Sequence, residues 1–267
     1  MIKIGVIGVA GRMGKAIVSC IEDTEGVDVC CGTEKVGHPA VGQDLGELTG
    51  VGKKNLAVVD RLESVVGGCD VLIDFSSPET SMETLAAAEK AQKSLVLGTT
   101  GFNSEQKGEI QRIARKTRCV MAPNMSIGVN VLFKMVEEMA RVLGAAYDVE
   151  IVEAHHKFKK DAPSGTAVRL SEIVAETLGR RIADVGVYGR KGMAPRTPEE
   201  IGIHTLRAGD IVGEHRVIFG GMGETLEVSH RAQSRDTFAR GAVRAAQWLM
   251  DQPVGLYDMQ DVLGLRP

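Results

Sequence analysis

The sequence has little of several features that would mark other classes of protein. Aromatic residues make up 4% of the 267 residues, which disfavours the stacking platforms that bind single-stranded nucleic acids. No apolar run is long enough to cross a bilayer, and residues 1–8 lead directly into a strand-like segment instead of a signal peptide. The net charge is only −3. We therefore expect neither a nucleic-acid nor a membrane partner.

The five cysteines lack an informative spacing. They stand at positions 20, 30, 31, 69 and 119, form no CxxC pair and are odd in number. This pattern argues against a zinc site and against a disulfide framework, so we expect no metal and a reduced, cytoplasmic setting. The length and the 43% hydrophobic content suffice for two moderate cores. Two domains are therefore expected.

Strands and helices alternate over the first 125 residues. Buried strands are expected at 2–7, 27–31, 56–59, 70–75, 94–97 and 118–121, with helices after the first, fourth, fifth and sixth of them and a long loop over 37–54. Such alternation predicts an α/β fold, a Rossmann-like doubly wound parallel sheet. Ligands of such sheets lie at the carboxyl ends of the strands.

A glycine-rich turn follows the first strand. Gly8, Gly11 and Gly14 are spaced as GxxGxxG, with Ala10 where the commoner dinucleotide fingerprint has its second glycine. Glycines let the backbone approach a pyrophosphate, and the following helix supplies N–H groups for the phosphates. A structural turn without a ligand is the alternative reading of this motif alone.

Two charged residues end the second strand. Glu34 lies 20 residues beyond Gly14, where an acidic side chain accepts hydrogen bonds from ribose hydroxyls and repels a 2′-phosphate. The neighbouring Lys35 would attract that phosphate, and Arg12 could also reach it. These residues leave NADH and NADPH both open as the cofactor.

The second half has a different periodicity. After an apolar helix that ends near residue 143, strands are expected at 147–152, 183–188, 201–207, 211–219 and 224–230, with a mobile loop at 189–200. Few helices separate these strands, which predicts a smaller α+β domain with an open mixed sheet. A helix over 236–250 is expected to return to the first domain. The predicted division is 1–125 with 236–267, and 126–235.

The most unusual stretch is 153–166, which places two adjacent histidines, three lysines and an aspartate between a strand and a helix. Pro163 to Thr166 carry helix-start chemistry, so the first N–H groups of that helix would favour a carboxylate or phosphate. A solvated basic turn is the plain alternative. The polar residues of 209–215 are interpreted as turn chemistry.

Residues 153–167 resemble the signature of the 4-hydroxy-tetrahydrodipicolinate reductase family, long called dihydrodipicolinate reductase. The matching segments, in order, are 8–14, 98–102, 124–130, 153–167, 207–215 and 234–239, so the resemblance covers essentially the whole chain. It implies an NADH- or NADPH-dependent reduction of a cyclic dicarboxylate in lysine and diaminopimelate biosynthesis. It also implies a homotetramer built by the second domain, and domain closure about the crossings near Ser126 and Arg235.

The resemblance further implies roles for individual residues. His155 would give and take a proton and Lys159 would donate one to the nitrogen side of the imine. Substrate contacts would be His156, Gly165 and Thr166. Cofactor contacts would be Gly8, Val9, Ala10, Gly11, Arg12, Met13, Glu34, Lys35, Gly98, Thr99, Thr100, Ala122, Pro123, Asn124 and Met125.

Three alternative functions remain from the sequence. A Rossmann dehydrogenase with another imine or keto acid as substrate would share the fold. A nucleotide-binding sensor would bind the cofactor without turnover. Nucleic-acid binding through Lys157 to Lys160 would weaken steeply with salt.

Overall fold

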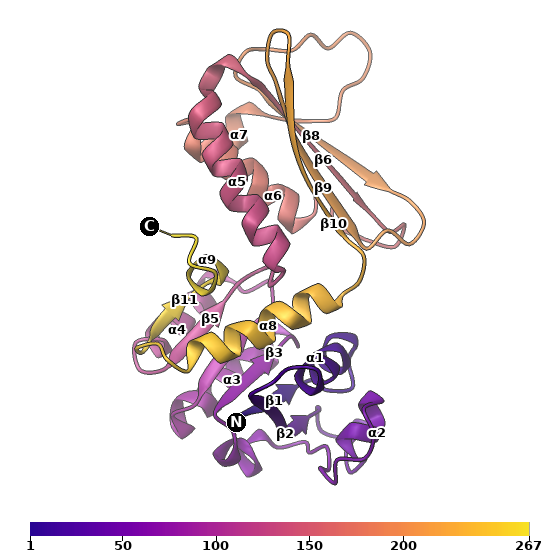
Figure 1. Ribbon diagram of the computed structural model, residues 1–267, viewed down its shortest axis with the longest axis vertical. Coiled ribbons are helices and arrows are strands. Elements are labelled where there is room, and N and C mark those ends of the chain that lie inside the picture. The colour runs from indigo at the N-terminus through magenta and orange to yellow at the C-terminus, as the bar shows by residue number, and fades with distance from the viewer. Residues whose placement is uncertain (267) are drawn as a thin grey trace. The chain divides into compact units, whose positions relative to one another are not determined.

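The computed structural model describes residues 1–266, which form two compact units (Figure 1). The first unit comprises 1–127 and 235–267, and the second comprises 128–234. The chain thus leaves the first unit once and returns to it for its last segment. The expected boundaries at 125/126 and 235/236 lie within two residues of these crossings.

The first unit is built on a six-stranded sheet in the order β11-β5-β4-β3-β1-β2, with every neighbouring pair parallel. Its strands are β1 (Ile2–Ile7), β2 (Val27–Thr33), β3 (Val71–Asp74), β4 (Ser94–Leu97), β5 (Arg118–Met121) and β11 (Gly255–Tyr257). The expected doubly wound parallel sheet is confirmed. The order reverses beside β1, which makes this point the place where ligands bind in open α/β sheets.

Helices cover both faces of this sheet. The helices of this unit are α1 (Arg12–Glu22), α2 (Leu45–Thr49), α3 (Pro78–Ala91), α4 (Ser104–Ile113), α8 (Asp236–Leu249) and α9 (Met259–Val262). Side chains alternate between two cores: Val71 and Ile73 of β3 pack with α1 and α8, whereas Leu72 packs with α3 and α4. Each fully buried aliphatic side chain of this kind contributes roughly 1.5–3 kcal/mol.

Two expectations for this unit are wrong. Residues 56–59 form only isolated bridges, Ala57 with Asp44 and Val59 with Thr33, because the Asp44 carboxylate accepts the backbone N–H groups of Lys54 and Leu56 and holds the segment as a loop. The expected loop at 37–54 contains α2, which is capped by the same Asp44. Strand β11 and helix α9 were not anticipated at all.

The second unit contains a five-stranded mixed sheet in the order β10-β9-β6-β8-β7. Its strands are β6 (Asp148–His155), β7 (Gly186–Tyr188), β8 (Ile201–Arg207), β9 (Gly213–Gly220) and β10 (Thr225–Ala232). Strands β6, β8 and β7 run parallel, while β9 and β10 are antiparallel to their neighbours. The expected open mixed sheet is confirmed.

Helices α5 (Ile127–Leu143), α6 (Gly165–Thr177) and α7 (Ile182–Val185) lie on one side of the second sheet (Figure 1). The core beneath them is apolar and includes Val149, Ile151, Val217 and Phe219. No helix among residues 1–266 covers the other face. The alternate residues of β6 and β9, such as Val152 and Ile218, therefore face away from the helices.

Two local expectations for the second unit also fail. Residues 183–185 belong to α7 (Ile182–Val185), and only Gly186–Tyr188 join the sheet. The strand expected to end at Val152 continues to His155, because β6 is paired on both sides, with β8 and with β9. The charged stretch at 153–166 is therefore partly strand, and its first histidine occupies a fixed position in the sheet.

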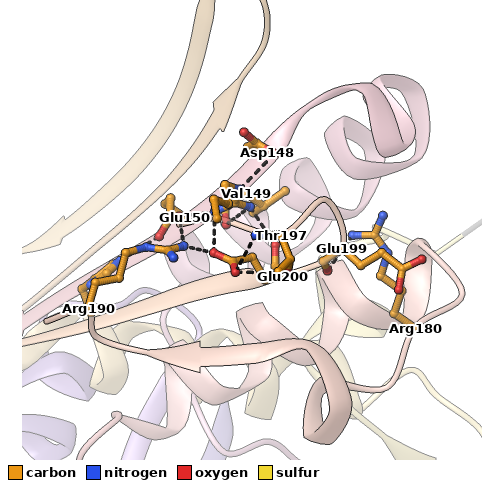
Figure 2. Close-up of polar contacts among 10 residues, drawn as sticks. Asp148, Val149, Glu150, Arg180, Arg190, Thr197, Glu199 and Glu200 are labelled. Atoms are coloured by element: carbon orange, nitrogen blue, oxygen red, sulfur yellow. Dashed lines mark hydrogen bonds and ion pairs between the residues drawn. The ribbon is translucent and has the colours of Figure 1, made fainter. Parts of the chain in front are cut away.

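Residues 189–200 are irregular, yet several of their side chains have fixed partners (Figure 2). Arg190 forms ion pairs with Glu150 and Glu200, and Arg196 pairs with Glu150 and with Asp148. Hydrogen bonds from Arg190 and from Thr197 to the carboxylate of Glu200 lower the pKa of that residue to about 2. This network joins the loop to the first residues of β6. The expected mobility of the loop remains a prediction.

Candidate active site

The first candidate site is a cavity of about 690 Å³ at the carboxyl ends of β1, β2 and β3. Among its lining residues are Gly8, Ala10, Gly11, Glu34 and Lys35, which the sequence predicts as cofactor contacts. The structure adds four loop residues, His38, Arg61, Phe75 and Ser76, and Thr80 in the first turn of α3. The sequence analysis missed these residues. Cavities of this size hold small organic ligands.

The glycine turn gives this cavity its floor. Gly8 has a φ of 68°, which is favourable for glycine, and a Cβ on Gly14 would lie 2.4 Å from the carbonyl oxygen of Gly8. Gly14 therefore permits α1 to begin directly beneath the turn. Gly11 is the N-cap of α1 and makes no side-chain cap, which leaves the first turn of the helix suited to phosphate oxygens.

Glu34 connects the second strand to the glycine turn. Its Oε1 accepts a hydrogen bond of 2.9 Å from the backbone N–H of Ala10. This contact holds the carboxylate over the turn and leaves Oε2 for a further donor. Ala10, which departs from the common fingerprint, therefore has its N–H group bonded to the acidic residue.

The other predicted cofactor residues follow β4 and β5, or lie between β1 and the first turn of α1, and the structure places them at the same edge of the sheet. Thr99 is buried, and its hydroxyl contacts Ser81 and Asp74 at 2.8 and 3.4 Å. Met125 is a core residue. The side chains of Thr99 and Met125 therefore contact other residues of the first unit. The residues of this set that do not line the cavity are Val9, Arg12, Met13, Gly98, Thr99, Thr100, Ala122, Pro123, Asn124 and Met125.

The second candidate site lies in the second unit and is organised by Glu153 on β6. This carboxylate is fully buried. Arg207 on β8 donates to both of its oxygens at 2.8 Å, and the backbone N–H of Ser164 donates at 3.0 Å. The Oε2 atom also lies 2.5 Å from Nδ1 of His155. We call Glu153, His155, Ser164, Arg207 and His215 the Glu153 cluster.

Glu153 carries a negative charge in the cluster. Burial alone would raise its pKa, but the guanidinium of Arg207, the imidazole of His155 and the N–H of Ser164 together bring it down to about 2. An ionised carboxylate only accepts hydrogen bonds. The proton between the two side chains therefore belongs to Nδ1 of His155, and Nε2 is the atom left to exchange a proton.

The two buried histidines of the cluster are neutral. Burial lowers the pKa of His155, and the charges of Lys159 and Arg207 lower it further while Glu153 opposes them. Burial lowers the pKa of His215 to about 3. The two rings meet edge to face with their centroids 5.2 Å apart, and Nε2 of His215 is 3.0 Å from the hydroxyl of Ser164. His155 is thus held on two sides.

Lys159 lies on the loop that follows β6. Its ammonium group is 3.0 Å from the carboxylate of Asp161 and its side chain is 22% exposed. The loop is tied back by bonds from Ala208 N–H to His155 O and from Lys157 N–H to Gly209 O. The structure therefore brings Lys159 and His155, four residues apart, to the same end of the sheet.

The predicted substrate contacts border this cluster. His156 is half-buried, and its Nδ1 is buried without a hydrogen-bond partner among the described residues. Gly165 and Thr166 are the first two residues of α6, whose N-cap Ser164 accepts a hydrogen bond from Ala167 N–H. The helix therefore begins at the Glu153 cluster, as the helix-start residues predict.

Arg207 and His215 were missed as site residues, and the interpretation of 209–215 as turn chemistry is wrong for His215. This residue is 4% exposed and lies within β9, next to His155. Only the sheet pairing brings β8 and β9 onto either side of β6. The signal in the sequence that could have found Arg207 and His215 was that both lie in the segment 207–215, which matches the family.

A parallel nucleotide-binding sheet with a glycine turn, joined in one chain to a buried carboxylate–histidine pair beside a lysine, defines a pyridine-nucleotide-dependent oxidoreductase. Comparison with known proteins identifies the class more closely. Residues 2–125 match the family described as "Dihydrodipicolinate reductase, N-terminus" and residues 128–263 match "Dihydrodipicolinate reductase, C-terminus". The chain belongs to the 4-hydroxy-tetrahydrodipicolinate reductase family.

Individual relatives agree with this assignment. Curated 4-hydroxy-tetrahydrodipicolinate reductases of Geotalea uraniireducens and Syntrophus aciditrophicus are 54% and 51% identical, each over the full length of both chains. A dipicolinate-bound dihydrodipicolinate reductase from Paenisporosarcina sp. matches with a TM-score of 0.78 at 26% identity over 98% of each chain. The chain is thus an NAD(P)H-dependent oxidoreductase of lysine and diaminopimelate biosynthesis. No helix among residues 1–266 is long and apolar enough to span a membrane.

Proposed function

We propose that this enzyme reduces 4-hydroxy-tetrahydrodipicolinate to tetrahydrodipicolinate, with His155 as the proton donor and acceptor and Lys159 as the proton donor to the nitrogen side. The observation that supports these roles is the buried Arg207–Glu153–His155 chain of hydrogen bonds beside Lys159. The relatives named above carry the name of this reaction. The nicotinamide supplies the hydride when it is bound.

The Glu153 cluster fits His155 for proton transfer. Glu153 fixes the proton on Nδ1 and orients the ring, so that Nε2 presents a lone pair. A Cβ on Gly213 would lie 3.1 Å from this Nε2, so the glycine leaves the space that the ring needs. When a dicarboxylate binds, its negative charge raises the pKa of His155, and the ring can then hold a proton.

The substrate carboxylates are proposed to bind at the start of α6. Gly165 and Thr166 place backbone N–H groups at the N-terminus of a 13-residue helix, where the helix dipole favours an anion. The unpartnered Nδ1 of His156 adds a group that a carboxylate oxygen can bind. The domain roles follow: 1–125 with 236–267 binds the dinucleotide, and 126–235 binds the substrate.

The cofactor is proposed to lie in the cavity of the first unit, which the glycine turn and α1 suit for a pyrophosphate. Glu34 would accept hydrogen bonds from the ribose hydroxyls through Oε2, while Lys35, the next residue, is exposed and would attract a 2′-phosphate. The remaining predicted contacts, at 98–100 and 122–125, follow β4 and β5 at the same edge of the sheet.

A homotetramer built by the second unit is also proposed. The uncovered face of its sheet carries Val152, Leu206 and Ile218 among charged residues, and Leu206 is 53% exposed. An apolar stripe on an open sheet face is typical of an interface between subunits. The free thiols of all five cysteines suit the proposed cytoplasmic location.

The test is the rate of NADH and NADPH oxidation with substrate freshly generated by the preceding aldol-condensing synthase. Fast consumption of either cofactor is expected, and the ratio of the two rates measures the combined effect of Glu34 and Lys35. An enzyme that binds both cofactors but oxidises neither would contradict the proposed substrate. Oxidation with an unrelated keto acid alone would identify a different dehydrogenase.

A further inference from the structure

Three cysteines that are scattered in the sequence meet at one point of the first sheet. The sulfur of Cys69 lies 3.3 Å from that of Cys30 and 3.3 Å from that of Cys31, and the three sulfurs lie within 4.8 Å of one another. Cys31 and Cys69 are buried, whereas Cys30 is partly exposed. We call these residues the thiol triad. It lies outside the cofactor cavity.

A bulge in β2 explains how two consecutive residues reach the same side of the sheet. Ile4 of β1 pairs with Val29, but the next residue, Gly5, pairs with Cys31, so that Cys30 has no partner in the register. In a regular strand Val29 and Cys31 would share a face. Here Val29 packs with α1 and α8, and Cys31 packs on the opposite side with α3 and α4.

Gly5 makes the space for the sulfurs. A Cβ at this position would lie 2.9 Å from the sulfur of Cys69 and 3.0 Å from that of Cys31. Cys69 itself precedes β3, the strand on the other side of β1. The triad therefore bridges across β1, between the bulge of one neighbouring strand and the start of the other.

We propose that the thiol triad is an oxidant-reactive site, in which Cys30 reacts with a peroxide and Cys69 then closes a disulfide with it. The Cys30 thiolate attacks one peroxide oxygen and becomes a sulfenic acid, and the other oxygen leaves as water after protonation. The thiol of Cys69 attacks the sulfenic sulfur, its proton leaves with the hydroxyl as a second water, and the S–S bond forms. Two thiols are oxidised and one peroxide is reduced.

The pKa values of the three thiols agree with a reaction in which Cys30 is oxidised first. Contacts from Cys31 and then Cys69 lower the pKa of Cys30, whereas the pKa values of Cys31 and Cys69 are raised by their contacts with Cys30 and by burial. The thiolate is the reactive form of cysteine, so Cys30, the partly exposed residue of the three, is also the nucleophile. The buried pair remains protonated and close to it.

The same environment disfavours a metal ion. A metal ion would need all three cysteines as thiolates. The two buried thiols, Cys31 and Cys69, would then have to lose their protons although their pKa values are raised. A disulfide leaves no charge in the apolar core that contains Leu72, Leu85 and Leu95. Formation of the disulfide needs only one thiolate, that of the partly exposed Cys30.

Cys31 is a second possible disulfide partner for Cys69. Its sulfur is as close to Cys69 as that of Cys30. After oxidation, attack of Cys31 on the sulfur of Cys69 would form a Cys31–Cys69 disulfide and release the Cys30 thiolate. The oxidised enzyme is thus expected to contain a mixture of two disulfides that share Cys69.

The experiment treats the folded full-length enzyme with graded hydrogen peroxide, then unfolds and alkylates it, and counts the adducts by intact mass. The reduced chain should take up five alkyl groups and the oxidised chain three, and dithiothreitol should restore five. Peptide mapping should find Cys69 joined to Cys30 or Cys31. Cys69→Ser should form no disulfide and accumulate sulfenic acid at Cys30.

The controls separate the triad from general thiol chemistry. Cys119→Ser and Cys20→Ser, outside the triad, should leave the oxidation unchanged, and Cys30→Ser should slow the loss of thiols by on the order of tenfold or more. Oxidation that proceeds equally in Cys69→Ser, or that spreads evenly over all five cysteines, would overturn the proposal. Protection of three thiols by added Zn²⁺, with no disulfide under peroxide, would replace it with a metal site.

Discussion

The Nδ1 atom of His155 lies 2.5 Å from the carboxylate of Glu153, two residues earlier on the same strand. Residues i and i+2 of a strand point to the same face, so β6 itself aligns the two side chains. Arg207 holds the far side of the carboxylate through two hydrogen bonds. The histidine is thereby fixed in one tautomer before any substrate arrives, and Glu153 acts as a positioning residue.

Glu153→Gln should lower kcat by roughly 10- to 100-fold with a much smaller change in KM, because the amide neither fixes the tautomer nor stabilises the imidazolium. Since Glu153 raises the pKa of His155, its loss should also move the limb of the pH–rate profile that reports the titration of His155 to lower pH. Steady-state kinetics between pH 5 and 9 measure both effects. Glu150→Gln, on the opposite face of β6, is the matched control; an unshifted limb in Glu153→Gln would remove Glu153 from proton transfer.

His155→Ala and Lys159→Ala should each reduce kcat by on the order of 10²- to 10⁴-fold, the range for a lost acid or base. The dissociation constant for NADH should stay within about twofold, since neither residue lines the cofactor cavity. Kinetics and fluorescence titration provide these values. Lys157→Ala, which changes an exposed lysine of the same loop, should retain activity; a folded variant of either residue with the wild-type rate would exclude it from the mechanism.

Glu34→Ala should weaken NADH by roughly tenfold and NADPH by less. The change removes both the proposed ribose contact and the hydrogen bond to Ala10 N–H, but it also removes a negative charge that repels the 2′-phosphate. Calorimetric titration of both cofactors would measure the difference. Asp28→Ala, which removes an exposed acidic residue of β2, the strand that Glu34 follows, controls for net charge. Equal losses for the two cofactors would argue against the ribose contact.

Buried His215 should make the enzyme less stable in acid. Its folded pKa is about 3, below the ordinary value of 6.5, so the unfolded chain binds an extra proton between these pH values. The stability that neutral His215 provides is complete above about pH 6.5 and is lost as the pH falls towards 3, with a slope approaching about 1.4 kcal/mol per pH unit. Urea unfolding at several pH values should show a shallower slope in His215→Asn than in the wild type and in His38→Asn.

Leu206→Lys should dissociate the proposed homotetramer. Light scattering should give the wild type four times the chain mass of 28.5 kDa and the variant a smaller assembly, because a charge would be buried in each copy of the interface. Leu226→Lys is the matched control: Leu226 is 47% exposed, but it pairs with Phe219 and so lies on the helix side of the sheet. A monomeric wild type would disprove this assembly.

The sequence by itself determined most of the strands and helices, though not α2, β11 or α9. It also determined the order along the chain of the polar residues that follow the strands. The alternation of strands and helices, the spacing of Gly8, Gly11 and Gly14, and the distance to Glu34 depend on local geometry, which short-range patterns record. The proximity of His155 and Lys159 could be predicted for the same reason, because the two residues lie only four positions apart in the sequence. The proposed catalytic roles of these two residues came from the family resemblance, because the periodicity of a sequence carries no information about catalysis.

Only the tertiary structure decided which distant residues meet. Arg207 is 54 residues from Glu153 and reaches it because β8 pairs with β6, a register set by the whole sheet. His215 joins through β9 on the other side. The thiol triad needed a one-residue bulge in β2 to turn Cys31 towards Cys69. Strand register and bulges arise from side-chain packing across the sheet, and no local pattern in one strand encodes its neighbours.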